Sequence, residues 1–172
     1  MDSASHFPTK QIVPSTEIVH DRVNLELFRG CIRGCRFCQA GYVYRPVRNR
    51  GVEKLLEQGI ESLKNTGYQE ITLSSLSSSD YRRLPELCDG LLDYCRDKSI
   101  SLALPSLRAD NFSMDIMRRV QTVRKSGLTF APEAGSQRLR DAINKNVKPM
   151  LVPDALVKVG RLDHSFSSQD TT

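Results

Sequence analysis

Three cysteines within eight positions constrain this chain more than any other feature. Cys31, Cys35 and Cys38 follow the spacing Cys-x3-Cys-x2-Cys, and an aromatic residue, Phe37, directly precedes the third cysteine. Three thiolates at this spacing can bind three irons of a [4Fe–4S] cube from one short loop, and they leave the fourth iron without a protein ligand. An iron with an open coordination position can bind a small molecule, so the motif predicts an enzyme centre.

Zinc, disulfides and a ferredoxin cluster explain the cysteines less well. A structural zinc site needs four protein ligands, and the two other cysteines, Cys88 and Cys95, lie far along the chain. The histidines stand in no ligand spacing (His6, His20, His164). Five cysteines are an odd number with no secretory signal before them, which disfavours a disulfide framework. Ferredoxins use four cysteines for each cluster, and the fourth is missing here.

Length and composition bound the remaining possibilities. The 172 residues have room for one ordinary domain, and 39% of them are hydrophobic without a run long enough to span a membrane. Free thiols and an oxygen-sensitive motif are typical of a reducing compartment. We therefore expect a cytoplasmic protein without a membrane partner.

Positive charge gathers around the cysteines. The chain carries a net charge of +5, yet the segment from Arg22 to Arg50 contains seven arginines, one acid and no lysine, a local net of +6. A thiolate-ligated cluster is anionic, so these arginines favour its reduced state and can hold an anionic substrate. The same pattern fits a nucleic-acid surface, which few aromatic residues support here. We expect at least Arg48 and Arg50 to lie on a solvated loop face.

Hydrophobic periodicity predicts alternating strands and helices. Strands are expected where short apolar runs end at polar loops, over residues 23–28, 69–73, 100–104 and 127–131. Helices are expected from Val52 to a stop near Gly67, over 84–95, from an N-cap at Ser113, and over 136–143. In the helix over 84–95, Cys88 and Cys95 fall on the leucine stripe, so we expect them to be buried structural residues.

The repeated strand–helix order predicts parallel strands with helices outside, and the loops that follow the strands then share one edge of the sheet. The first such loop holds the cysteines, and the next three carry the serine-rich segment 74–79, then Arg108, then Glu133. Each can face a ligand above the sheet edge. The alternatives are a flexible solvated loop for the serines, and a surface ion pair or a helix cap for Arg108 and Glu133.

The motifs together resemble the radical S-adenosylmethionine (SAM) superfamily. The cysteine spacing with Phe37 matches its signature, and similar stretches lie at 7–14, 27–31, 39–46, 76–81, 105–110 and 129–139. They are most similar to the catalytic domain of a subfamily whose members usually carry a cobalamin-binding domain ahead of it. The resemblance implies an α/β fold, a partial (β/α) barrel of parallel strands with about four of six strand–helix units present.

The resemblance also implies a reaction. Cys31, Cys35 and Cys38 would hold a [4Fe–4S] cluster whose free iron binds the amino and carboxylate groups of SAM. An electron from a donor such as flavodoxin or ferredoxin would cleave SAM to methionine and a 5′-deoxyadenosyl radical, which attacks an unknown substrate. The cofactors carry this chemistry, and the protein supplies position and electrostatics.

Further SAM contacts follow from the same resemblance. Phe37 lies where the family packs adenine, and Arg108 would bind the SAM carboxylate. Glu133 would accept hydrogen bonds from the ribose or the amino group. By position in the repeats, the serine loop replaces the family's Gly-Gly-Glu segment, so Ser75 and Ser77 would hold the amino group.

The two ends of the chain depart from the family pattern. Residues 1–20 indicate an N-terminal extension, 21–147 the radical SAM core, and 148–172 a divergent tail expected to be disordered. We expect a C-terminally truncated barrel without a cobalamin-binding domain. Two other functions stay open: an inactive fragment that binds a cluster only, and a metal-containing nucleic-acid-binding module suggested by the arginines. Several members of the family modify tRNA, so a transferase acting on RNA would combine both pictures.

Overall fold

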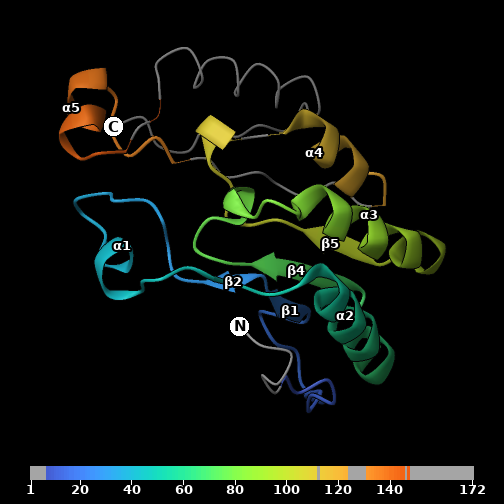
Figure 1. The fold of residues 1–172 in the computed structure, drawn as a ribbon. Coiled ribbons are helices and arrows are strands. Elements are labelled where there is room, and N and C mark those ends of the chain that lie inside the picture. Colours follow the sequence, from blue (N-terminus) through green and yellow to red (C-terminus); the bar gives the residue numbers. More distant parts are fainter. Residues whose placement is uncertain (1–6, 112, 124–130, 146, 148–172) are drawn as a thin grey trace.

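A three-stranded parallel sheet forms the centre of the fold (Figure 1). The computed structural model describes residues 7–111, 113–123, 131–145 and 147. Strand β1 (Val23–Glu26) pairs in parallel with β4 (Glu70–Ser74), and β4 pairs in parallel with β5 (Ser101–Ala103). The interior of β4 is buried throughout, as expected for a central strand covered on its faces. The predicted α/β fold with parallel strands is confirmed.

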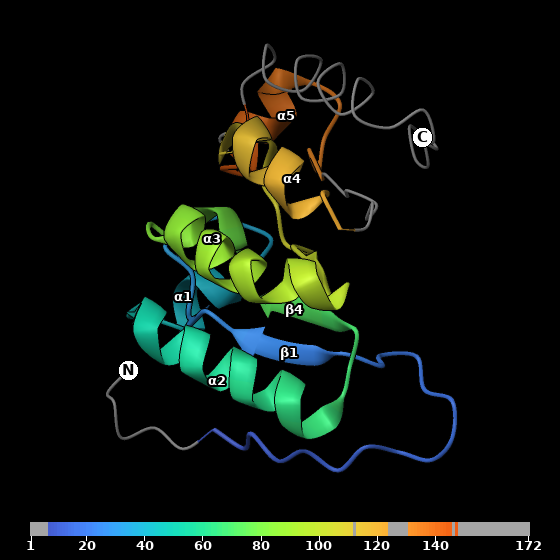
Figure 2. The same cartoon turned by 90° about the vertical axis from the view of Figure 1, so that its right-hand side faces the viewer.

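Three helices pack along this sheet, side by side in Figure 2. They are α2 (Val52–Thr66), α3 (Leu84–Cys95) and α4 (Met114–Val120). Helix α2 contacts β1, α3 contacts α2 and β5, and α4 contacts α3 and β5. The predicted apolar stripe of α3 is buried along its whole length, including Cys88 and Cys95. The prediction that these two cysteines are structural core residues therefore fits their environment.

Glycines set how closely α2 packs and where it ends. Gly59 faces the sheet, where an added β-carbon would stand 3.1 Å from the Ile71 side chain. After Thr66 the chain turns at Gly67, whose φ of 72° is left-handed, and its N–H donates to the carbonyl of Leu63 at 3.0 Å. This is a common way for a helix to end, and it confirms the predicted stop.

The first predicted strand, over 23–28, is divided in two. Its last part forms β2, which pairs in the antiparallel direction with a second short strand. These strands are β2 (Phe28–Arg29) and β3 (Arg48–Asn49). Leu27 joins the two sheets, because its N–H donates to the carbonyl of Ser74 and its carbonyl accepts from the N–H of Arg50, both at 3.0 Å. The cysteine loop therefore leaves and re-enters the fold at adjacent points.

The prediction of a solvated Arg50 is wrong. Only 8% of this residue is exposed, and its Nη2 lies 3.1 Å from the carboxylate of Glu26. Its guanidinium carbon also lies 5.8 Å from the centre of the Phe7 ring. The carboxylate at the end of β1 supplies the partner that a buried charge needs, and such a partner cannot be read from the local sequence. Arg48, in β3, is exposed as expected.

The other predicted elements have mixed outcomes. Strands β4 and β5 and helix α5 (Gln137–Ala142) lie close to their predicted ranges. Ser113 precedes α4 as predicted, but its side chain makes no capping hydrogen bond. The predicted strand over 127–131 falls almost wholly outside the described residues, as does the tail over 148–172, so the number of barrel units and the nature of the tail stay predictions. Every helix in the described ranges is too short or too polar to cross a lipid bilayer.

Candidate metal centre

The three cysteines lie on one loop that follows β2, beyond the carboxyl end of β1 (Figure 1). The loop begins at Gly30 and runs into helix α1 (Ala40–Val43). Gly30 has a φ of 94°, and a β-carbon there would overlap a backbone oxygen across the loop, so the turn requires glycine. Cys35 is buried, whereas Cys31 and Cys38 are half-buried. The loop thus presents its thiols near the surface at the edge where the parallel strands end.

One cavity of about 300 Å³ adjoins this loop. Every predicted site residue except Ser75 lines it, namely Cys31, Cys35, Cys38, Phe37, Ser77, Arg108 and Glu133. Its walls come from the cysteine loop, from the loops after β4 and β5, and from the segment around α5. The fold therefore brings together side chains that are far apart in the sequence.

The serine loop after β4 is an ordered turn rather than a solvated segment. Ser77 and Ser78 are 3% and 0% exposed. The hydroxyls of Ser75 and Ser78 are hydrogen-bonded at 2.9 Å, and the N–H of Ser77 donates to the Ser75 hydroxyl at 3.3 Å. The N–H of Ser78 donates to the carbonyl of Ser106, which ties this turn to the loop after β5. The Ser75 hydroxyl thus shapes the turn, while Ser77 reaches the cavity.

The hydroxyl of Ser77, in the cavity wall, has no regular hydrogen-bond partner among the described residues. The oxygen is buried and completes no hydrogen bond of ordinary geometry with the described residues, although it lies near enough to Asp80 to affect that carboxyl group. Buried polar atoms are nearly always hydrogen-bonded in native proteins. A hydroxyl in this position is available to a ligand in the cavity.

Arg108 belongs to a buried ion pair at the cavity wall. Its Nε and Nη2 donate to the two carboxylate oxygens of Asp110 at 2.8 and 2.9 Å, and Nη2 also donates to the carbonyl of Lys145. The Arg108 side chain is 10% exposed, so the alternative of a surface ion pair does not describe it. Nη1 makes no hydrogen bond with the described residues, and it remains free to bind a carboxylate.

Glu133 and Lys145 form a second pair across the cavity. Lys145 Nζ donates to Glu133 Oε1 at 2.9 Å, and it lies 5.9 Å from the centre of the Phe37 ring. Glu133 has a left-handed φ of 67°, which is uncommon for a residue with a β-carbon. Phe37 is more than half exposed, so its ring is accessible at the cavity mouth. Nothing in the local sequence singled out Lys145.

Arg33, between the first two cysteines, connects the cysteine loop to two acidic side chains. Its Nε donates to Asp80 Oδ2 at 2.9 Å, its Nη2 bonds Asp80 Oδ1, and its Nη1 lies 3.6 Å from Asp110 Oδ2. Burial raises the pKa of Asp80, but hydrogen bonds from Arg33 and Asn111, with the Ser77 hydroxyl nearby, hold it below its ordinary value. The hydrogen bond to Asp80 is the main reason that the pKa of Arg33 is raised. The sequence signal for this pair was an arginine inside the motif and an acid at the end of the serine loop.

Ion pairs neutralise part of the arginine-rich segment, with Glu26 inside it and with Glu70 and Asp80 from elsewhere in the chain. Four of its seven arginines form ion pairs in the structure. The pairs are Arg22–Glu70, Arg29–Glu26, Arg33–Asp80 and Arg50–Glu26. An arginine that is already paired contributes little to binding phosphates. The folded segment is therefore a weaker candidate for a nucleic-acid surface than its sequence suggests.

The donor chemistry of the cavity fits an iron–sulfur cluster. Within the described ranges, no three histidine, cysteine or acidic side chains converge into a ready-made metal site, so loading would require the loop to draw its sulfurs together. Three thiols of one loop nevertheless line one cavity, which is the ligand set that a cluster with one open iron needs. Within the described part of the chain, Nη1 of Arg108 and the hydroxyl of Ser77 have no regular hydrogen-bond partner and can also meet a ligand there.

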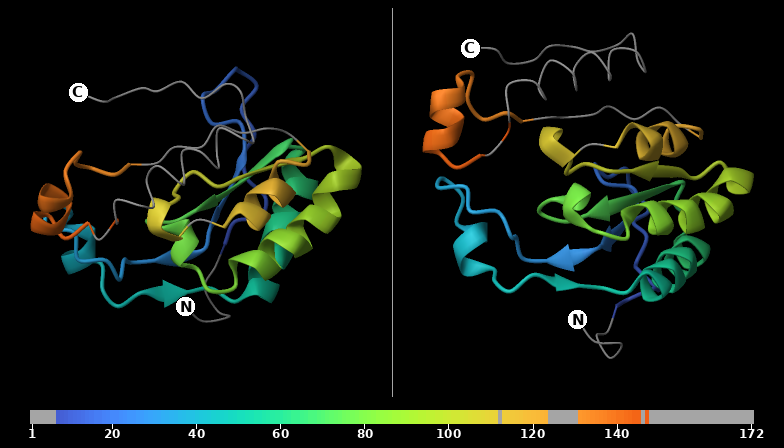
Figure 3. Two further views of the ribbon diagram at one scale, coloured as in Figure 1. Left: turned by 90° about the horizontal axis from the view of Figure 1, so that it is seen from above. Right: turned by 45° about the horizontal axis from the view of Figure 1, so that its top comes forward.

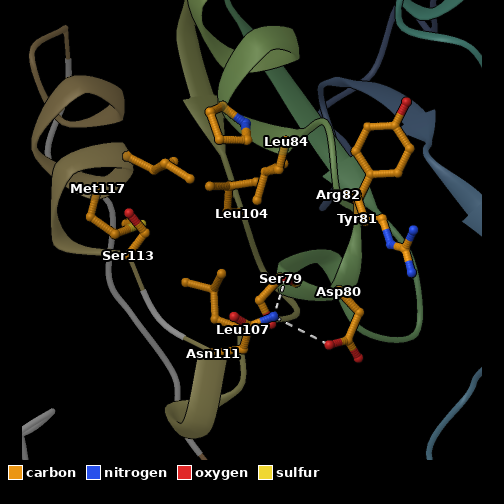
Figure 4. Close-up of a pocket in the computed structure, with 12 residues that line it drawn as sticks. Ser79, Asp80, Tyr81, Arg82, Leu84, Leu104, Leu107, Asn111, Ser113 and Met117 are labelled. Atoms are coloured by element: carbon orange, nitrogen blue, oxygen red, sulfur yellow. Dashed lines mark hydrogen bonds between the residues drawn. The ribbon is translucent and has the colours of Figure 1, made fainter.

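A larger cavity, of about 440 Å³, lies next to the cysteine cavity, and Leu107 lines both (Figure 4). It opens between the start of α3 and the start of α4. Its walls are mixed, with the apolar side chains of Leu104 and Met117 in one part and the polar side chains of Asp80 and Asn111 at one side. No cysteine lines it, so it is distinct from the candidate metal centre.

Comparison with known proteins places the chain in one family. The profile of the Radical SAM superfamily matches residues 25–160. A protein of Methanocaldococcus jannaschii named "Uncharacterized protein MJ0966" is 36% identical over 132 residues, which are 77% of this chain and 28% of that protein. A second protein of that organism, named "Putative methylthiotransferase MJ0865", is 24% identical over 132 residues, which are 72% of this chain and 29% of that protein. The chain thus spans less than a third of the length of these relatives, and it belongs to the radical SAM superfamily.

Proposed function

We propose that Cys31, Cys35 and Cys38 hold a [4Fe–4S] cluster and that SAM binds in the adjoining cavity. The observation that carries this proposal is that a single cavity joins the three thiols to polar side chains of three other segments. Membership of the radical SAM superfamily supports it, because the family generally uses this cluster and SAM. When bound, the cluster would supply the electron that cleaves SAM reductively to methionine and a 5′-deoxyadenosyl radical.

The protein's own contribution at the cysteines is to hold and tune the sulfur ligands. The backbone N–H of Arg33 already points at Cys31 Sγ, at 3.4 Å. Hydrogen bonds to ligating sulfurs are one of the means by which a protein sets the reduction potential of a cluster. The N–H of Cys38 donates to the carbonyl of Cys35 at 3.1 Å, which turns the chain between the second and third thiols.

The polar residues of the cavity would bind and orient SAM. Arg108 would receive the SAM carboxylate at its free Nη1 while Asp110 keeps the rest of the guanidinium in place. The Ser77 hydroxyl would accept a hydrogen bond from the amino group. Glu133 would accept from the amino group or the ribose, in exchange for its contact with Lys145.

Phe37 and Ser75 have supporting roles in this proposal. The exposed ring of Phe37 would pack near the adenine at the mouth of the cavity. Ser75 would act through the turn that it stabilises rather than by touching the cofactor. An electron donor of the flavodoxin or ferredoxin type would deliver the electron to the half-buried edge of the loop.

In its relatives, the segment that matches this chain is part of a longer protein, and the final reaction depends on that whole protein. Neither relative is named as a cobalamin-binding protein, so cobalamin has no place in the proposal. The name of the second relative makes transfer of a methylthio group one candidate outcome, and an unknown substrate accepts the radical. The main alternative hypothesis is that this chain binds the cluster but does not cleave SAM. Analysis of the reaction products distinguishes this hypothesis from the proposal.

The test is formation of 5′-deoxyadenosine by the reconstituted chain. Protein loaded anaerobically with iron and sulfide is mixed with SAM and dithionite, and the products are separated by chromatography. The proposal predicts 5′-deoxyadenosine from the native chain and none from a variant in which Cys31, Cys35 and Cys38 are all alanine. Cys88→Ala with Cys95→Ala is the matched control, and it should retain iron, sulfide and product. Product that survives loss of the three loop cysteines would overturn the proposal.

A further inference from the structure

We propose that Arg33 is a positioning residue, which fixes the cysteine loop over the cavity through Asp80. Arg33 lies between Cys31 and Cys35, and Asp80 is 47 positions away at the end of the serine loop. The pair is bidentate, and the Asp80 side chain is only 8% exposed. Two parallel charge-assisted hydrogen bonds fix orientation as well as distance. The contact therefore sets where the first half of the cysteine loop lies.

Asp80 is already held in place without Arg33, so it can act as an anchor. Asn111 Nδ2 donates to Asp80 Oδ1 at 3.3 Å and to the carbonyl of Ser79 at 2.5 Å (Figure 4). The N–H of Asp80 donates to the carbonyl of Ser77 at 2.9 Å. These contacts come from the loops after β4 and β5, which stand on the central sheet. The anchor is thus part of the rigid scaffold, whereas Arg33 belongs to the loop that must be positioned.

The second half of the cysteine loop is held separately, by residues that follow α5 (Figure 3). Asn144 Nδ2 donates to the carbonyl of Gly34 at 2.7 Å, and the N–H of Arg36 donates to the carbonyl of Ile143 at 2.9 Å. Cys35 is flanked by Gly34 and Arg36, lies two residues from Arg33, and is 8% exposed. Without the Arg33 contact, the loop at Cys35 would be held from the α5 side and no longer from Asp80, so Cys35 should become more exposed without unfolding of the sheet.

Arg33 also connects the loop to the cation that the proposed function assigns to SAM. Its Nη1 lies 3.6 Å from Asp110, the same carboxylate that holds Arg108 in a bidentate pair. A displaced Arg33 would leave Asp110 to Arg108 alone. This second part of the inference rests on the proposed function, whereas the positioning of Cys35 does not.

The experiment measures how fast each thiol of the metal-free chain reacts with iodoacetamide. Peptide mass spectrometry gives separate rates for Cys35, Cys88 and Cys95 at one fixed pH. The last two are buried in α3, so their rates report opening of the whole domain. In Arg33→Gln and in Asp80→Asn, the rate at Cys35 should rise about tenfold or more, the size expected for lost charge-assisted hydrogen bonds. The rates at the other two thiols should stay near those of the native chain.

The two variants distinguish a displaced loop from a changed local charge as the cause of a new alkylation rate at Cys35. Loss of the cation alone would slow alkylation of nearby thiols, whereas loss of the Asp80 charge alone would speed it, since the thiolate is the reacting form. Positioning predicts faster alkylation in both. The exchanged pair, Arg33→Asp with Asp80→Arg, should return the Cys35 rate most of the way to the native value. Arg83→Gln is the matched control, because Arg83 also bridges two acids but is exposed and does not line the cavity.

Each outcome decides the matter. An unchanged rate at Cys35, a slower rate in Arg33→Gln, or parallel increases at Cys35, Cys88 and Cys95 would overturn the positioning role. In reconstituted protein, both single variants should also weaken the change that SAM causes in the EPR spectrum of the reduced cluster. If the native chain binds no cluster, the proposed function is wrong, but the alkylation rates still test the role of Arg33. If the EPR spectrum of the native chain changes with SAM but the variants alkylate at native rates, only the role of Arg33 is wrong.

Discussion

Gly41 lies directly against the backbone carbonyl of Arg33. A β-carbon added at Gly41 would overlap that oxygen, and Gly34 is the next neighbour. Gly41 is buried in α1, one turn beyond the third cysteine of the motif. The short helix after the cysteines is therefore packed onto the loop that carries them, and the packing leaves no room for a side chain.

Substitution of Gly41 by alanine should disturb the cysteine loop. We expect the variant to lose about 1–3 kcal/mol of stability, as overpacked sites do, and to bind less iron after reconstitution. Urea unfolding and iron analysis measure both effects. The control is Gly135→Ala, because a β-carbon there meets nothing within 4 Å and the φ of Gly135 is not left-handed. Equal behaviour of the two variants would contradict the close packing of α1.

The buried Arg50 should matter for stability far more than its exposed neighbour. Arg50→Gln removes the partner of Glu26 and the cation over Phe7, and should lower the free energy of unfolding by about 2 kcal/mol. The value is below that of a fully buried pair, because Glu26 is partly exposed and also contacts Arg29. Arg48→Gln should change the urea midpoint little. A similar shift in both variants would show that Arg50 is not held as described.

Two core thiols should make the protein less stable in alkali. Burial raises the pKa of Cys88 to about 12 and that of Cys95 to about 11, from an ordinary value of 9.0. In the unfolded chain these thiols ionise near pH 9, whereas in the folded chain they stay protonated. The free energy of unfolding should therefore fall as the pH rises from about 9 to about 11, by up to about 1.4 kcal/mol per pH unit for each thiol.

Replacement of both core thiols by alanine checks this pH dependence. The double variant Cys88→Ala with Cys95→Ala should be less stable near pH 8 because it leaves small cavities, but its slope against pH should be shallower. Urea unfolding at intervals from pH 8 to about pH 11 gives the slope directly. An identical slope in the native chain and the double variant would mean that these thiols are not protected by the core.

Arg108 should govern SAM affinity if its free nitrogen binds the carboxylate. Arg108→Gln should weaken SAM binding by the reconstituted chain about tenfold or more, since a charge-assisted hydrogen bond is lost. Arg119→Gln is a control, because Arg119 also pairs with an aspartate, Asp89, both of whose carboxylate oxygens accept from its Nη1, but it does not line the cavity. Calorimetric titration gives both affinities. Equal losses, or no loss in Arg108→Gln, would assign the carboxylate to another residue.

The sequence predicted those parts of the fold that depend on local pattern. The 3.6-residue spacing of apolar side chains located α2 and α3, and Gly67 located the end of α2, because a left-handed turn favours glycine. The edge of the sheet that carries the cysteine loop followed from the alternation of strands and helices. These features need no knowledge of distant partners.

The features that the sequence patterns did not predict depend on contacts between residues that are distant in the sequence. Arg50 is buried because Glu26 and Phe7 surround it, and neither contact has a local signal. The division of the first strand depends on a pairing with β3 that a single apolar run cannot reveal. In the candidate site, the contacts of Asp80 with Arg33 and of Lys145 with Glu133 depend on the fold, so the local sequence did not predict them.

The most direct test of the central claim is the EPR spectrum of the anaerobically reconstituted, dithionite-reduced chain, recorded with and without SAM. The account predicts a reduced [4Fe–4S] signal that changes when SAM is added, because the iron without a cysteine ligand accepts the cofactor. A cluster signal that is indifferent to SAM would contradict the proposed cofactor site. Absence of any cluster, with zinc bound by the same cysteines, would contradict the account as a whole.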